Sequence, residues 1–205
     1  MVGGIVLREC LASSEIAKVT SITRRASGVV HEKLNEIVLQ DFLDYSSISE
    51  QFNDQDAVYY CQGVYTGQVP DDQFKLITYD YVKAFADMLK EQSPEATFCL
   101  LSGAGADQTE QSRMSFAKYK GMAENHLISK EFHKLYIFRP AYIYPVEKRK
   151  APNFMYSFSR AIYPLFKAVY PKGVITSEQL GKAIFKAGLN GARKMILENQ
   201  DIKEV

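Results

Sequence analysis

Several charged and polar residues, together with a phenylalanine and two glycines, stand directly after short apolar segments of this sequence. They are Arg24, Arg25, Asp41, Phe42, Gln62, Gly63, Ser102, Gly103 and Arg139. A guanidinium group pairs with phosphate oxygens, and a carboxylate accepts hydrogen bonds from sugar hydroxyls. If the apolar segments are parallel strands, these residues all lie at one edge of the sheet, where such sheets bind ligands. The two arginines favour a phosphate-bearing ligand there, although a solvated pair at a strand end fits them too.

The cysteines and histidines do not indicate a metal or redox site. No C-x-x-C spacing occurs, and the three cysteines lie in apolar segments, which favours buried thiols over a redox pair or metal ligands. The three histidines lack the H-E-x-x-H spacing of a zinc site. Gly103-Ala104-Gly105 is not followed by G-K-[ST], so a tight turn explains it better than a phosphate loop. The cysteines are Cys10, Cys61 and Cys99.

Strand-like and helix-like segments alternate along nearly the whole chain. Apolar residues at helical spacing predict helices at 2–13, 72–92, 113–129 and 177–189. Apolar or β-branched runs predict strands at 19–23, 36–40, 57–61, 97–102, 135–138 and 195–197. Alternation of this kind implies βαβ crossovers. We therefore expect an α/β fold, a Rossmann-like doubly wound parallel sheet with helices on both faces, in a single domain over 1–205. The sequence begins with a helix where such a fold begins with a strand.

Composition bounds the class of protein. With 205 residues, 46% apolar and 24% charged, the chain fits one globular domain and not a disordered or disulfide-stapled chain. It has no apolar run near the ~18 residues of a membrane span, and no secretory signal, so we expect a cytoplasmic protein. Residues 1–100 hold 8 Lys and Arg against 15 Asp and Glu, and the rest hold 17 against 9. Because no basic block occurs, neither nucleic acid nor a membrane surface is an expected partner.

Six short motifs, in order, resemble those of a known superfamily. They are K-V-T-S-I-T-R-R (18–25), Y-C-Q-G (60–63), Y-D-Y-V (79–82), L-L-S-G-A-G-A-D (100–107), K-Y-K-G-M-A-E (118–124) and I-F-R-P (137–140). Their order and spacing resemble the short-chain dehydrogenase/reductase superfamily, in its atypical NAD(P)-binding, epimerase/dehydratase-like branch with the Tat-interacting oxidoreductase-like proteins. The resemblance spans essentially the whole chain.

The resemblance implies a nucleotide site whose glycine motif begins ahead of residue 1. Gly3 matches the last glycine of the family's G-x-x-G-x-x-G turn. The earlier glycines, and a first strand that is central in the family's sheet, would precede Met1. The resemblance thus leads us to expect a longer natural chain. Without that strand its two neighbours lose a hydrogen-bonding partner.

The resemblance also assigns cofactor-binding positions. Arg24 and Arg25 stand where the family selects its cofactor, and arginine suits the 2′-phosphate of NADP better than the ribose hydroxyl of NAD. We therefore expect NADP, with NAD as the alternative. The pairs Asp41-Phe42 and Gln62-Gly63 match positions that line the adenine and its ribose. Asp41 is alternatively the cap of a helix beginning near residues 46–49.

The catalytic positions depart from the family pattern. The family uses a serine with a tyrosine and lysine spaced Y-x-x-x-K, in which the tyrosine exchanges a proton with the substrate. Ser102 matches the serine and Lys120 the lysine, which also holds the nicotinamide ribose, but Phe116 stands at the tyrosine position. Tyr119 is a candidate replacement, although packing against the sheet explains it as well. The resemblance implies an NADPH-dependent oxidoreductase acting on a carbonyl or alcohol, and the loss of the phenol favours a non-catalytic nucleotide-sensing or protein-interaction module instead.

A segment rich in aromatic and basic residues follows the predicted strand at 135–138. In the family this region, 146–175 here, covers the nicotinamide pocket as a substrate-side lid. Interleaved cations and aromatics also fit a membrane surface or a protein partner, including a second copy of the chain. The sequence does not identify the small-molecule substrate.

Overall fold

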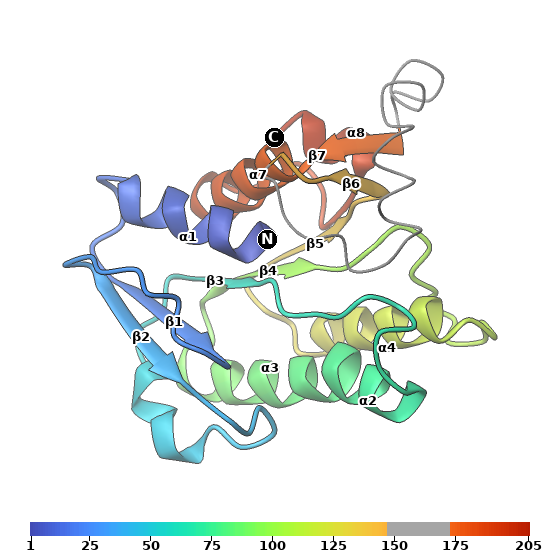
Figure 1. Cartoon of the computed structure of the whole chain (residues 1–205), viewed down its shortest axis with the longest axis horizontal. Coiled ribbons are helices and arrows are strands. Elements are labelled where there is room, and N and C mark those ends of the chain that lie inside the picture. Colours follow the sequence, from blue (N-terminus) through green and yellow to red (C-terminus); the bar gives the residue numbers. More distant parts are fainter. Residues whose placement is uncertain (147–172) are drawn as a thin grey trace.

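The computed structural model describes residues 1–146 and 173–205 as alternating strands and helices (Figure 1). The strands are β1 (Val19–Thr23), β2 (Leu34–Val38), β3 (Ala57–Tyr60), β4 (Thr97–Leu101), β5 (Lys134–Arg139), β6 (Tyr142–Tyr144), β7 (Val174–Thr176) and β8 (Ile196–Glu198). The helices are α1 (Val2–Ala12), the 3₁₀ helix η1 (Ser46–Phe52), α2 (Asp71–Lys75), the π-helical η2 (Leu76–Asp80), α3 (Tyr81–Gln92), α4 (Ser115–Ser129), α7 (Ser177–Asn190) and α8 (Asn199–Lys203). The predicted α/β class is confirmed.

Every strand pair among the described residues is parallel, and these pairs form three separate ladders. The largest has the order β3-β4-β5-β8, while β1 pairs with β2 and β6 with β7. Among the described residues, β1 and β3 are not hydrogen-bonded to each other. A groove of about 880 Å³ is lined by residues of both strands. The sheet is therefore divided between β1 and β3 in the described part of the chain.

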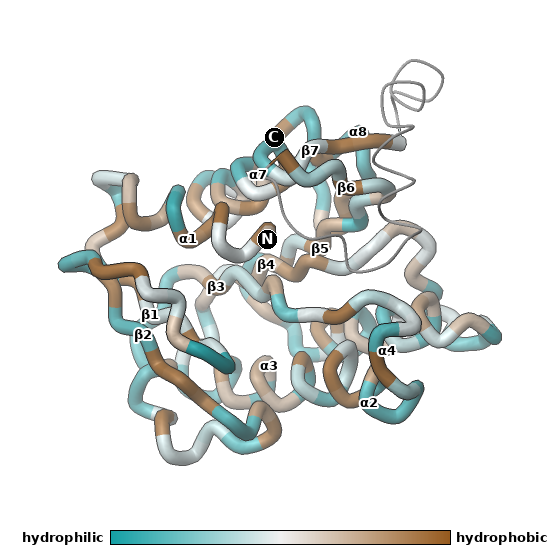
Figure 2. Tube along the Cα trace, viewed as in Figure 1, coloured by the Kyte–Doolittle hydropathy of each residue, from teal (hydrophilic) through white to brown (hydrophobic). Residues whose placement is uncertain are grey.

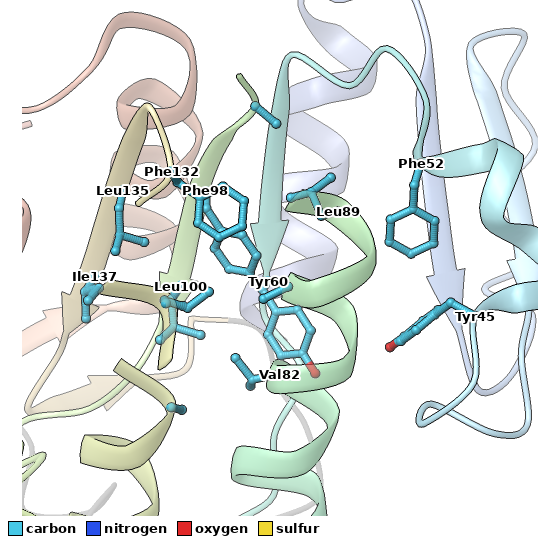
Figure 3. Close-up of a cluster of buried hydrophobic side chains, with 14 of the residues drawn as sticks. Tyr45, Phe52, Tyr60, Val82, Leu89, Phe98, Leu100, Phe132, Leu135 and Ile137 are labelled. Atoms are coloured by element: carbon cyan, nitrogen blue, oxygen red, sulfur yellow. The ribbon is translucent and has the colours of Figure 1, made fainter. Parts of the chain in front are cut away.

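Helices cover both faces of the four-stranded sheet. On one face α3 and α4 pack over a cluster that contains Phe98, Leu100, Leu127 and Ile137, all nearly inaccessible to solvent (Figure 3). On the other face α1 and α7 contribute to a second cluster around Cys99 and Phe138. In Figure 2 the chain is apolar along much of β4 and β5, as expected for strands that are buried on both faces.

Most predicted elements begin and end within two residues of the observed ones. Strand β2 is shifted two residues toward the amino end, because it pairs with β1 in the register Val19 to Leu34. The helix predicted over 72–92 contains one π-helical segment, η2, so its side chains change face part of the way along. Strands β6 and β7 and helix α8 were not predicted from the sequence.

Helix α4 lies against the loop after β4, and one glycine permits this contact. A Cβ at Gly121 would overlap the carbonyl oxygen of Asp107, whose backbone N–H donates to the carbonyl of Ala117 over 2.9 Å. Gly4 in α1 is different, because a Cβ there would meet nothing within 4 Å. Packing therefore requires glycine at position 121 but not at position 4, and Gly4 provides a control for substitutions of Gly121.

Replacing Gly121 with alanine is expected to destabilise the protein by about 3 kcal/mol or more, because a backbone segment must move to admit the methyl group. Gly4→Ala is expected to be neutral or to stabilise by about 0.5–1 kcal/mol through helix propensity. Urea unfolding of both variants measures the difference. Equal stability of the two variants would contradict the close approach at Gly121.

Candidate functional site

Ser102 lies just after β4 and is tied to a buried carboxylate. Its hydroxyl donates to Oε1 of Glu124 over 2.6 Å, and its side chain is largely shielded from solvent. Glu124 is on α4 and has no exposed surface. Because an ionised carboxylate accepts hydrogen bonds and donates none, the single proton of the Ser102 hydroxyl is committed to Glu124.

Arg139 neutralises this buried carboxylate. Its Nε donates to Oε1 of Glu124 over 3.0 Å, and Nη2 donates to Oε2, which gives a bidentate pair. Gln108 Nε2 donates to Oε2 over 3.0 Å, so both oxygens of Glu124 accept two hydrogen bonds. The hydrogen bonds to Glu124 raise the pKa of the Arg139 guanidinium. Nη1 of Arg139 also reaches Glu198 at the end of β8, over 3.3 Å.

Lys120 lies one helical turn before Glu124 and points toward the end of the same strand. Its Nζ donates to the carbonyl oxygen of Leu101, the last residue of β4, over 3.2 Å. Burial lowers the pKa of Lys120 to about 8, and the nearby Glu124 acts in the opposite direction. Lys120 therefore titrates close to neutral pH, which an exposed lysine does not do.

Phe116 lies at the end of β4 as well. A Cβ on Gly103 would be 2.6 Å from Cζ of Phe116, so the ring sits directly over this glycine. Ser102, Lys120 and Phe116 thus converge where β4 ends, as the resemblance to short-chain dehydrogenases implies. A phenyl ring supplies no proton at that position.

Tyr119 points elsewhere. Its hydroxyl donates to Oδ2 of Asp71 at the start of α2 over 2.7 Å, and its ring contacts Phe74 with centroids 6.2 Å apart. The hydrogen bond to Asp71 raises the pKa of Tyr119, whereas a catalytic phenol needs a lowered one. These contacts join α4 to α2, so Tyr119 packs against a helix where the packing interpretation expected the sheet.

Arg24 and Arg25 follow β1 and are both exposed. Neither guanidinium pairs with a carboxylate within 1–146 and 173–205. Arg24 lines the groove between β1 and β3. Two free guanidinium groups at the carboxyl end of a parallel strand fit a phosphate group.

The other predicted nucleotide positions are divided between the surface and the core. Asp41 is exposed, and its Oδ1 accepts from the backbone N–H of Leu43 over 2.8 Å. Asp44, and not Asp41, accepts from Ser46 at the start of η1, so the alternative that Asp41 caps this helix is wrong. Phe42 is buried and packs on Tyr81, with ring centroids 5.5 Å apart.

Gln62 and Gly63 follow β3. The side-chain oxygen of Gln62 accepts from the Tyr60 hydroxyl over 3.2 Å, and Gln62 lines the groove. Gly63 is exposed, and a Cβ there would meet nothing within 4 Å. Gly3 lies close to β3, since a Cβ on it would be 3.2 Å from Cβ of Cys61. Gly3, Arg24 and Gln62 therefore surround the same end of the groove.

Glu124 and Gln108 were not identified from the sequence. The available signal was a single glutamate four residues after Lys120, within a predicted helix. Such a spacing places Lys120 and Glu124 on one helix face. Their partners Ser102 and Arg139 lie 22 and 15 residues away in the chain, a distance at which sequence spacing gives no contact.

The remaining sequence predictions concern thiols, metals and the lid. The cysteines are free thiols, and burial raises the pKa of Cys10 to about 11 and that of Cys61 to about 12. The described residues include no cluster of three potential metal ligands and no helix long and apolar enough to cross a bilayer. The proposed lid over 146–175 falls almost entirely on 147–172, outside the described residues.

Glu124→Gln is expected to destabilise the protein by about 3 kcal/mol, because Arg139 then keeps a largely buried charge without a carboxylate partner. Glu178→Gln is the matched control. It removes an ion pair to Arg8 of 3.0 Å whose side chains are 53% and 32% exposed, so the expected loss is below about 1 kcal/mol. Thermal and urea unfolding compare the variants, and similar losses would contradict a structural role of the buried pair.

Comparisons with known proteins identify relatives of the chain. No family model matches the chain. The sequence is 30% identical over 141 residues to the protein HTATIP2 of Rattus norvegicus, covering 67% of this chain and 57% of that protein. It is 29% identical over 142 residues to the mitochondrial protein FMP52-1 of Scheffersomyces stipitis, covering 68% and 62%. The chain thus spans less than two thirds of the length of either relative.

Solved structures agree on the fold. The enzyme WbmH of Bordetella bronchiseptica, in complex with NAD⁺, superposes with a TM-score of 0.69 at 15% identity, over 96% of this chain and 71% of that one. The UDP-glucuronic acid 4-epimerase of Bacillus cereus, in complex with NAD, gives 0.69 at 13% identity, over 97% and 74%. The predicted resemblance is confirmed: the chain has the Rossmann-type fold of the short-chain dehydrogenase/reductase and epimerase proteins and, in sequence, matches the branch that contains HTATIP2.

Proposed function

We propose that the protein binds a nicotinamide adenine dinucleotide at the carboxyl edge of its sheet, prefers NADP, and acts as an oxidoreductase on a carbonyl or alcohol. The observation that supports this proposal best is the pair Arg24 and Arg25. Both guanidinium groups are exposed beyond β1 and are not paired with a carboxylate in the described part of the chain. A phosphate on the adenosine ribose supplies the missing counter-charge, and NAD lacks it.

The residues at the end of β4 fit the nicotinamide half of such a cofactor. Bound there, the cofactor supplies the hydride chemistry. Lys120 holds its ammonium next to the carbonyl of Leu101 and, with a pKa lowered to about 8, keeps a donor available for a ribose hydroxyl at neutral pH. Ser102 offers only its lone pairs to a ligand, because its hydroxyl donates its hydrogen bond to Glu124. A substrate hydroxyl is therefore a better partner for Ser102 than a carbonyl oxygen is.

Within residues 1–146 and 173–205, neither candidate for the usual tyrosine donor supplies the proton. Phe116 has no ionisable group, and the Tyr119 hydroxyl is bound to Asp71. In an oxidoreductase built this way the proton is exchanged with water, which predicts slow turnover. The phenylalanine at position 116 favours the alternative function, a nucleotide-sensing module without catalysis.

The cofactor preference is tested by thermal stabilisation with NADPH and NADH. A ligand at 100 times its dissociation constant adds about 2.7 kcal/mol of stability. NADPH is expected to stabilise the protein more than NADH does. Replacing Arg24 and Arg25 with alanine is expected to weaken the binding of NADPH at least about tenfold, because charge-assisted hydrogen bonds are lost. The binding of NADH is expected to change little.

Arg193→Ala is the control, because Arg193 is an exposed arginine between α7 and β8, away from the carboxyl end of β1. Arg193→Ala is expected to leave the binding of both NADPH and NADH unchanged. Equal stabilisation by NADPH and NADH, or a similar effect of all three substitutions, would contradict the assigned phosphate site.

The choice between catalyst and sensor is tested by Phe116→Tyr. The substitution places a phenol two helical turns from Glu124 and next to Lys120, so reductase turnover of a panel of carbonyl compounds with NADPH is expected to rise about 100-fold. Phe116→Leu is the control and is expected to leave turnover at the level of the unmodified protein. Turnover that appears only in the Phe116→Tyr variant favours the nucleotide-sensing function. Ready turnover by the unmodified protein contradicts that function.

A further inference from the structure

The chain between β1 and β2 turns back at the two arginines. Because the strands are parallel, this connection must return from the end of β1 to the start of β2 (Figure 1). Ser27 is hydrogen-bonded to Glu36, and Glu36 lies opposite Ser21 in the ladder. Since Ser21 precedes Ser27 in the chain, the backbone has reversed its direction between these two residues. Arg24 and Arg25 are bent residues within this reversal, at the carboxyl end of β1.

One half-buried carboxylate holds the turn. The backbone N–H of Ser27 donates to both oxygens of Glu36, over 3.1 Å to Oε1 and 2.9 Å to Oε2. The hydroxyl of Thr23 donates to the carbonyl oxygen of Arg25 over 2.9 Å, which closes the turn locally. Among the described residues, Glu36 is the one hydrogen-bonding partner of residues 24–29 that lies outside 23–29. Glu36 thus attaches the turn to the sheet.

The rest of the connection supplies little order of its own. Residues 24–30 are all exposed. Gly28 has a φ of 75°, in the left-handed region that glycine adopts without strain. The next contact with another element is made by Lys33, whose Nζ donates to the carbonyl oxygen of Ser13 over 2.7 Å. Without the Glu36 carboxylate, the hydrogen bonds of the described residues would attach 24–30 only at the two ends of the connection.

Glu36 does not compete with a ligand for the arginines. In the part of the chain that the structure describes, its carboxylate forms no ion pair with a lysine or an arginine. A carboxylate paired with a guanidinium would occupy the donors that a phosphate group needs. Bound to a backbone N–H instead, Glu36 fixes the main chain next to Arg24 and Arg25 and leaves their side chains available.

Two effects of Glu36 on a bound phosphate oppose each other. Its negative charge lies near the site and repels the phosphate, but charges at an exposed surface are screened by water and salt. Its hydrogen bond orders the turn before the ligand arrives, which reduces the conformational entropy lost on binding. Because residues 24–30 are exposed and Glu36 alone connects them to the sheet among the described contacts, we expect the ordering effect to be the larger.

We propose that Glu36 is the positioning residue of the cofactor-selecting site. By holding the backbone of Ser27, it keeps Arg24 and Arg25 in place for a phosphate on the adenosine ribose, and so it sets the preference for NADP over NAD. This role rests on the proposed binding of NADP, since a nucleotide without that phosphate does not use the two arginines.

Titration with NADPH and with NADH, followed by nucleotide fluorescence, tests the role of Glu36. Glu36→Ala removes the acceptor and is expected to weaken the binding of NADPH about tenfold, because the arginines are then no longer ordered in advance. The affinity for NADH is expected to change little, which also shows that the variant is folded. Exchange of the Ser27 amide with solvent, measured without nucleotide, is expected to become about tenfold faster.

Two control variants separate the hydrogen bond from the charge. Glu36→Gln keeps an acceptor oxygen for the Ser27 N–H but removes the charge, and it is expected to bind NADPH at least as tightly as the unmodified protein. Glu32→Ala removes an exposed acidic residue of the same connection, which forms no hydrogen bond or ion pair among the described residues. It is likewise expected not to weaken the binding of NADPH.

The outcomes distinguish this role from the proposed function. An unchanged ratio of NADPH to NADH affinity in Glu36→Ala, tighter binding of NADPH by that variant, or equal losses in Glu36→Ala and Glu36→Gln would each overturn the positioning role and leave the NADP preference standing. If the unmodified protein binds NADPH no more tightly than NADH, the proposed preference is wrong, and the role of Glu36 falls with it.

Discussion

The buried ion pair between Glu124 and Arg139 holds the carboxyl edge of the sheet together. Glu124 on α4 binds Ser102 after β4 and Arg139 at the end of β5, and Arg139 continues to Glu198 on β8. Removing one partner of a buried pair costs about 3–5 kcal/mol, so α4 has one favourable position relative to these strands. That position determines where Lys120 and Phe116, one and two turns earlier on the same helix face, are placed.

This arrangement affects which proton transfers are available. The same carboxylate that fixes α4 accepts the hydrogen bond of the Ser102 hydroxyl, and the carbonyl of Leu101 accepts a hydrogen bond from Lys120. Polar groups that serve a reaction in a dehydrogenase are here satisfied within the protein. Together with phenylalanine at position 116, these contacts make binding of a nucleotide easier to explain than fast turnover.

The sequence predicted the fold well, because β-branched runs and helical apolar spacing are local signals. It also placed Ser102 after β4 and Arg24 after β1, where the structure has them, since both follow apolar runs that form parallel strands. The position of Lys120, on α4, came from the family resemblance. Contacts between residues that are far apart in the sequence could not be predicted. Glu124 resembled an ordinary polar residue of a helix, and the direction of the Phe42 ring into the core could not be inferred from its place after a strand. The π-helical η2 contacts α4 and has no distinct local pattern in the sequence.

Two parts of the carboxyl edge are held by different kinds of interaction. Gly3, Arg24 and Gln62 line the same groove, one from α1 and the others from beyond β1 and β3. No ladder among the described residues joins β1 to β3, so backbone hydrogen bonds between these two strands do not set the distance from Arg24 to Gln62. The geometry of Ser102, Glu124 and Lys120 is different, because hydrogen bonds join α4 directly to the end of β4. The end of β4 is therefore positioned independently of the groove between β1 and β3.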